Sequence, residues 1–77
     1  MPYFFFQWND EILEHLAEHG VTAEEFEAIV QAPDGKGKSR SSGHPIAFGD
    51  TDDGRTLACV YKMIDEMTVE PITAYEV

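Results

Sequence analysis

Two histidines stand four positions apart in the segment His15-Leu-Ala-Glu-His19. On a helix this spacing puts both imidazoles on one face, where they could hold a metal ion, as in zinc peptidases with the H-x-x-E-H pattern. No third ligand is marked in the sequence. His19 also has a local role open to it, because a protonated imidazole suits the negative end of a helix dipole. Metal binding stays an alternative, and we expect no cofactor.

A second group of reactive side chains is cationic. The segment 33–45 holds Lys36, Lys38, Arg40 and His44 among residues typical of turns. It is expected to be a loop, which either continues to residue 45 or merges into a strand from Lys38 onward. Glycine and serine amides nearby could help to hold an anion. The segment is therefore either a solvated loop or a site for a phosphate or an acidic partner.

Arg55 follows directly after Gly54, the last residue of an expected hairpin turn over 50–54. Two positions are open to its guanidinium. It could point into a groove beside the cationic loop, or it could form a surface ion pair with Asp52 or Asp53. The sequence does not decide between them.

The charge of the whole chain limits the partners that it can take. Its 77 residues include 15 acidic and 5 basic side chains, which gives a formal net charge of −10. A chain of this length forms one domain with a thin core, so we expect a single domain over residues 1–77. Phosphates repel such a chain, which argues against general nucleic-acid binding. The charge then serves either solubility alone or the binding of a basic partner.

The cysteine content and the first residues indicate the compartment. Cys59 is the one cysteine, so an internal disulfide is excluded, and its apolar surroundings predict a buried, inert thiol. The start of the chain has no basic region, and the apolar run Tyr3-Phe-Phe-Phe6 is too short for a signal peptide or a membrane span. We expect a cytoplasmic protein that does not enter a membrane.

The stretch 54–64 predicts the central strand of a sheet, because apolar residues alternate along it between two faces. One face is expected to be fully covered and the other partly. Further strands are expected at 3–8, 46–49 and 68–77, and Pro71 indicates an edge position or a bulge in the last of them. The residues assigned to the two faces are Leu57, Cys59, Tyr61 and Met63 on one, and Ala58, Val60 and Ile64 on the other.

Two helices are expected between the strand over 3–8 and the strand over 46–49. Asn9 can cap a helix over Asp10–His19, and Thr22 with Glu25 predicts a capping box for a second helix that ends before Pro33. The order β-α-α-β-β-β predicts an α+β domain. We expect its two N-terminal helices to pack on a roughly four-stranded antiparallel sheet.

Four segments together resemble the BrnT family of toxins, in the family's order and with similar spacing over nearly the whole chain. BrnT toxins are small bacterial ribonucleases of type II toxin–antitoxin pairs. The resemblance implies a fold like that of the RelE toxins. The matching segments are Phe6-Gln-Trp8-Asn, Glu18-His-Gly-Val21, Gly54-Arg-Thr-Leu-Ala-Cys-Val-Tyr61 and Ile72-Thr-Ala74.

The chain departs from this family in its charges. Lysines of the family fall at Glu11 and Glu18, its asparagine falls at His15, and the two arginines of its last strand fall at Glu70 and Tyr75. An ammonium at about 4 Å from a phosphate gains about 4 kcal/mol at an effective dielectric of about 20, and a carboxylate there loses as much. The resemblance therefore implies the fold more directly than it implies the activity.

Two functions follow from the resemblance and these departures. The first is a non-catalytic or strongly diverged protein that acts by protein contact in a toxin–antitoxin-like or regulatory setting, with a cognate antitoxin or a second copy as partner. The alternative is an active endoribonuclease with a reworked site. His19 would then be the general acid or base, Arg55 and Arg40 the phosphate clamps, and Tyr75 or His15 a helper.

Overall fold

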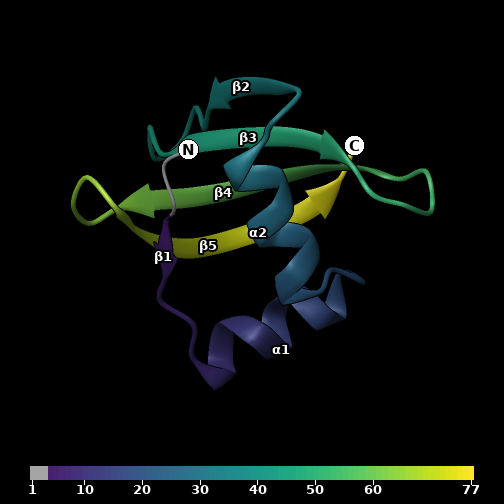
Figure 1. Cartoon of the computed structure of the whole chain (residues 1–77), viewed down its shortest axis with the longest axis horizontal. Coiled ribbons are helices and arrows are strands. Elements are labelled where there is room, and N and C mark those ends of the chain that lie inside the picture. Colours follow the sequence, from purple (N-terminus) through teal and green to yellow (C-terminus); the bar gives the residue numbers. More distant parts are fainter. Residues whose placement is uncertain (1–3) are drawn as a thin grey trace.

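The computed structural model describes residues 4–77, in which the second of two short helices lies over one face of a five-stranded sheet and the first lies beside its C-terminal strand (Figure 1). The sheet order is β1-β5-β4-β3-β2, and β1 runs parallel to β5 while the other neighbours are antiparallel. No helix in the described part of the chain is long and apolar enough to cross a membrane. The elements are β1 (Phe5–Phe6), α1 (Asp10–Glu18), α2 (Ala23–Gln31), β2 (Gly35–Lys38), β3 (Pro45–Asp50), β4 (Thr56–Met63) and β5 (Thr68–Glu76).

Both helices begin at the caps that the sequence predicts. The side chain of Asn9 accepts a hydrogen bond from the backbone N–H of Ile12 at 2.8 Å. Thr22 and Glu25 form a complete capping box, in which the N–H of each residue donates to the side chain of the other. The helix expected over Asp10–His19 ends one residue earlier, and His19 is its C-cap. These local signals therefore place both helices correctly.

The central strand β4 has the two apolar faces that its alternation predicts as far as Tyr61, but Met63 is 37% exposed and Ile64, which lies beyond the strand, is 46% exposed. Leu57, Cys59 and Tyr61 pack under the helices, whereas Ala58 and Val60 belong to a smaller cluster on the opposite face. The larger cluster is the main core of the domain. Its other buried members are Leu16, Val21, Phe26, Ile29, Val30, Ala47, Val69 and Ala74.

The prediction of a loop over residues 33–45 is wrong for Gly35–Lys38. These four residues form β2 and pair with β3 along their whole length. Alternating glycine and lysine carry no apolar pattern, so the sequence gives no local signal for a strand. The partner supplies the reason: a Cβ at Gly37 would lie only 3.1 Å from the ring of Phe48, so the bare glycine lets the ring lie against β2.

The prediction of an antiparallel sheet of about four strands is also wrong for the first strand of the chain. The strand expected over residues 3–8 is reduced to Phe5–Phe6, and it pairs with Thr68 and Val69 in parallel at the edge of the sheet. Tyr3 lies outside the described residues. The fold is α+β as expected, but the sheet has five strands and is mixed.

The last strand contains the bulge that Pro71 predicts. Along the ladder with β4, Val60 pairs with Thr73 and the next residue, Tyr61, pairs with Pro71, so that Ile72 has no partner. A bulge of this kind bends the strand and raises its twist. The partners of β1 in β5 are Thr68 and Val69, so Pro71 lies beyond the part of β5 that β1 pairs.

Candidate functional site

Arg55 is held by three groups from two parts of the chain. Its Nη1 donates to the carbonyl oxygen of Gly20 at 2.7 Å and its Nη2 to Oε2 of Glu25 at 2.8 Å. Its Nε donates to both carboxylate oxygens of Asp53 at 3.0 Å. Of the two positions left open by the sequence, Arg55 therefore takes the ion pair. It ties the β3–β4 hairpin to the turn between α1 and α2.

Arg55 and the three groups that bind it, Asp53, Glu25 and the Gly20 carbonyl, are called the clamp below. Within it, Arg55 and Asp53 stabilise each other's charged form. Hydrogen bonds from the Thr51 hydroxyl and from Arg55 lower the pKa of Asp53 below its ordinary value. The hydrogen bond to Asp53 raises the pKa of Arg55 in turn. Both groups are therefore charged at neutral pH. The positive charge of the guanidinium is matched by two carboxylates, those of Asp53 and Glu25.

His19 lies close to this clamp along the chain, next to Gly20. Its ring is edge-on to that of His15, with 5.0 Å between the centroids. Nε2 of His15 lies 2.8 Å from the hydroxyl oxygen of Thr73 in β5. No cluster of three or more histidine, cysteine, aspartate or glutamate residues that could hold a metal occurs within residues 4–77. The pair of imidazoles thus has no third protein ligand among them.

Arg40 lies far from Arg55. It belongs to the turn between β2 and β3, whereas Arg55 follows β3 at the other end. The six residues of β3 separate the two by on the order of 20 Å at about 3.4 Å per residue. The two arginines therefore cannot hold the same phosphate.

Tyr75 lies on the other side of the sheet from the clamp. It pairs with Ala58, and cross-strand partners share a face. Ala58 belongs to the cluster on the face away from the helices, whereas Arg55 binds Gly20 and Glu25 on the helical side. Tyr75 and Arg55 therefore lie on opposite faces of the sheet.

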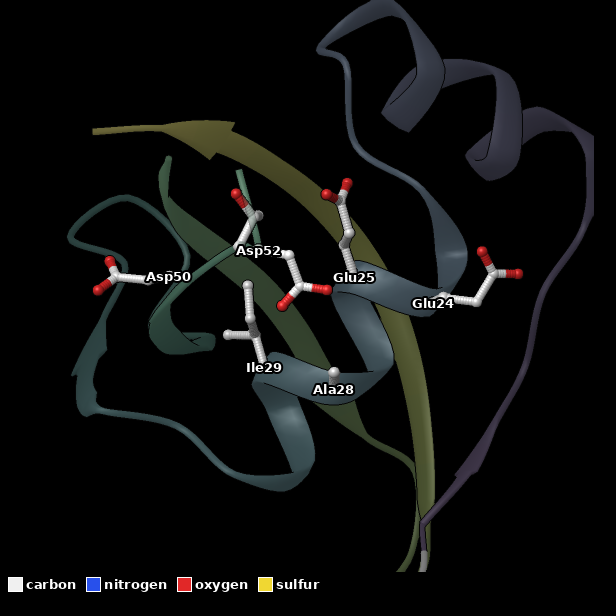
Figure 2. A pocket seen from close by; sticks show the side chains of 7 residues that line it. Glu24, Glu25, Ala28, Ile29, Asp50 and Asp52 are labelled. Carbon is white, nitrogen blue, oxygen red and sulfur yellow. The ribbon is translucent and has the colours of Figure 1, made fainter. Parts of the chain in front are cut away.

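A cleft of about 250 Å³ opens between the first turn of α2 and the β3–β4 hairpin, next to the clamp (Figure 2). Its two sides carry carboxylates, from the helix on one side and from the hairpin on the other. The sequence shows both acidic groups but not that they meet, because they are separated by about one third of the chain. The lining residues are Glu24, Glu25, Ala28, Ile29, Asp50, Thr51 and Asp52.

Cys59 is fully buried in the main core, as its position in the central strand predicts. Burial raises the pKa of its thiol to about 12. The thiolate is the nucleophilic form, so at neutral pH this side chain is protonated and inert. It takes no part in a candidate site.

The predicted catalytic residues are thus spread over three places. His19 and Arg55 lie on the helical side at one end of β3, Arg40 lies at its other end and Tyr75 lies on the opposite face. Cleavage of a phosphodiester needs its cations and its acid–base groups within one substrate width.

Comparison of the chain with protein-family models, curated proteins and solved structures finds no match.

Proposed function

We propose that this protein is a non-catalytic, strongly diverged relative of the BrnT toxins that acts by binding another protein. The observation that carries the proposal is the occupied guanidinium of Arg55. All three of its nitrogens donate hydrogen bonds, to Asp53, Glu25 and the Gly20 carbonyl. The two carboxylates outweigh the single positive charge of Arg55, so they cancel its attraction for a phosphate although two of its five N–H groups have no partner among the described residues.

The surroundings of Arg55 also oppose an RNA substrate. Four of the seven residues that line the neighbouring cleft are acidic and none is basic. Each carboxylate raises the free energy of a phosphodiester placed there, by an amount of the same order as a lysine would lower it. The chain as a whole adds to this with a net charge of −10. A protein partner does not have to enter this acidic cleft.

Exposed apolar side chains support contact with a protein. Phe5 is 69% exposed, Ile64 46% and Met67 42%. They lie at the same end of the sheet, because the N–H of Phe5 donates to the carbonyl of Met67 at 2.6 Å and Ile64 belongs to the same β4–β5 turn. Apolar groups gathered on a surface are typical of protein interfaces.

The setting that we propose is a cytoplasmic toxin–antitoxin-like or regulatory pair, and the fold that we propose is RelE-like. The partner is a cognate antitoxin or a second copy of the chain. These proposals rest on the four segments that resemble BrnT toxins and on the order of the helices and strands.

A cleavage assay with purified protein tests the proposal. Wild-type protein is expected to leave a structured RNA and a single-stranded RNA intact. The variants His19→Ala and Arg55→Ala serve as references, because a contaminating nuclease would act equally in all three preparations. Cleavage by the wild type that both variants lose would overturn the proposal.

RNA cleavage is the second candidate function, and one observation favours it. The rings of His15 and His19 lie 5.0 Å apart, and two adjacent imidazoles can divide the roles of general acid and general base. On this reading cleavage would depend on pH in a bell shape. It would also be lost in both His15→Ala and His19→Ala, whereas Arg40→Ala would retain it because Arg40 lies at the other end of β3.

A further inference from the structure

We propose that the outer edge of β2 binds an extended acidic segment of the partner protein as an added strand. This inference rests on the proposed function in one respect, since it takes the partner to be a protein. β2 is the last strand in the sheet order, and among residues 4–77 it pairs only with β3 (Figure 1). An edge of this kind is where extended peptides add to a sheet.

The backbone of β2 presents its free groups in the required pattern. Lys38 is opposite Pro45, which has no N–H, so this pair lies at a position without ladder hydrogen bonds. Because such positions alternate along an antiparallel pair, Gly35 and Gly37 bond to β3. The N–H and C=O groups of Lys36 and Lys38 then point away from the sheet. They offer two donors and two acceptors to an added strand.

The side chains of the same two residues supply charge complementarity. Lys36 and Lys38 are exposed, share one face of β2 and are separated by about 7 Å, the spacing of alternate residues in a strand. Arg40 follows in the adjoining turn. In the described part of the chain Arg55 alone forms salt bridges, so all three of these cations are unpaired. Acidic side chains at every second position of an added strand would match them.

The other face of β2 offers an apolar contact. Gly35 and Gly37 are paired with Phe48 and Ile46 of β3, so their open side faces the smaller apolar cluster. Phe48 is partly exposed there, because glycine has no side chain to cover it. A residue of the added strand on this face can reach the ring of Phe48. The segment that fits therefore alternates acidic and apolar residues.

Other occupants fit this edge less well. If two copies paired through β2, Lys36 and Lys38 of one would face those of the other, and like charges directly across a sheet are destabilising. Lysines on an edge strand commonly prevent such self-association. RNA could meet the cations, but it lacks the row of alternating peptide N–H and C=O groups that pairs with the free groups of a strand edge.

The test uses a fluorescent seven-residue peptide that alternates glutamate and valine, titrated with the full chain. Saturable binding in fluorescence polarisation is expected, with amide shifts at Lys36 and Lys38 in NMR spectra. The double variant Lys36→Glu/Lys38→Glu is expected to bind at least about tenfold more weakly. The single variant Lys36→Glu is compared with its matched control Lys62→Glu, which makes the same charge change on β4, two strands away from this edge.

Two further arms separate strand addition from simple charge attraction. A peptide methylated on alternate backbone nitrogens keeps every charge but cannot form the ladder, so it is expected not to bind. Absence of saturable binding, equal binding of the methylated peptide, stronger binding of a single-stranded RNA, or dimerisation through this edge would overturn the proposal. None of these results bears on the cleavage assay, so the two proposals fail separately.

Discussion

At the scale of single residues, the groups that neutralise Arg55 decide whether its guanidinium is available to a ligand. The sequence places this arginine after a hairpin glycine and offers Asp53 as a nearby partner. It cannot show that Glu25, thirty positions earlier, completes the ion pair, because that contact depends on how α2 packs on the sheet. The chemical nature of a side chain is thus readable from sequence, but its availability is decided by the tertiary contacts around it.

Replacing Arg55 by alanine is expected to lower the midpoint of thermal unfolding by several degrees. The change leaves the carboxylates of Glu25 and Asp53 and the Gly20 carbonyl without their donor. Circular dichroism on heating measures it. Arg40→Ala is the matched control, since Arg40 forms no ion pair within the described residues; equal losses in the two variants would contradict this role for Arg55.

The loss of thermal stability caused by Arg55→Ala is expected to depend on pH. The pKa of Asp53 is lowered from its ordinary value of 3.8 by Thr51 and Arg55, so its ionised form stabilises the native state above that pH. This contribution is lost as the pH falls through the lowered pKa. The difference in midpoint between wild type and Arg55→Ala should therefore shrink below about pH 4.

At the scale of elements, the helices are predictable and the edges of the sheet are not. Asn9 and the Thr22–Glu25 box act within three residues, so the sequence alone locates the starts of α1 and α2. The strands at the two edges depend on partners far along the chain. Nothing in the alternating glycines and lysines of β2 announces a strand, and only the pairing with β3 makes it one. Local signals are sufficient where the stabilising contacts are local.

The packing of α2 on β3 gives a prediction at this scale. A Cβ at Gly49 would lie 3.0 Å from Cγ1 and 3.1 Å from Cγ2 of Ile29, which is shorter than ordinary van der Waals contact, so Ile29 would have to shift by a few tenths of an ångström. Gly49→Ala is expected to lower the free energy of unfolding by about 1–3 kcal/mol, the usual cost of overpacking a core. Urea unfolding measures it.

Gly35→Ala is the matched control for this substitution. It also adds a methyl group to a strand glycine that does not have a positive φ, but its Cβ would meet Phe48 at an ordinary 4.0 Å. Its effect should therefore be small. The double variant Gly49→Ala/Ile29→Ala should lose less than the sum of its two single variants, because the smaller side chain makes room for the added methyl. Additive losses would argue against the clash.

At the scale of the whole molecule, the arrangement of charge matters more than its sum. The acidic cleft and the cationic edge of β2 are separate sites on the domain. The cleft adjoins the hairpin that follows β3, whereas the cations lie on β2 and in the turn that precedes β3. The sequence gives the net charge and the grouping of Lys36, Lys38 and Arg40. It does not show that the carboxylates of α2 and the hairpin form one cleft. That pattern separates the acidic cleft from the cationic edge at which we propose that an acidic segment binds.

Self-repulsion gives the last prediction, which concerns salt. The chain carries 15 acidic side chains against 5 basic ones, and within residues 4–77 the salt bridges are those of Arg55 alone. With a radius of gyration of 11.4 Å, most of its charges interact at low ionic strength. From about 0.01 M to about 1 M salt the Debye length falls from about 30 Å to about 3 Å. Sodium chloride should therefore raise the midpoint of thermal unfolding, because it screens more repulsion than attraction.

Arg55→Ala sharpens this last comparison, because the variant has lost the attractive pairs and keeps the repulsive ones. Its midpoint should rise more steeply with salt than that of the wild type. Lys62→Glu should do the same, since it adds repulsion without touching the clamp. If the midpoint of the wild type instead fell as salt was added, the ion pairs of a single arginine would outweigh the excess of ten negative charges. Attractive contacts that salt screens, rather than repulsion between acidic side chains, would then dominate the electrostatics of the native state.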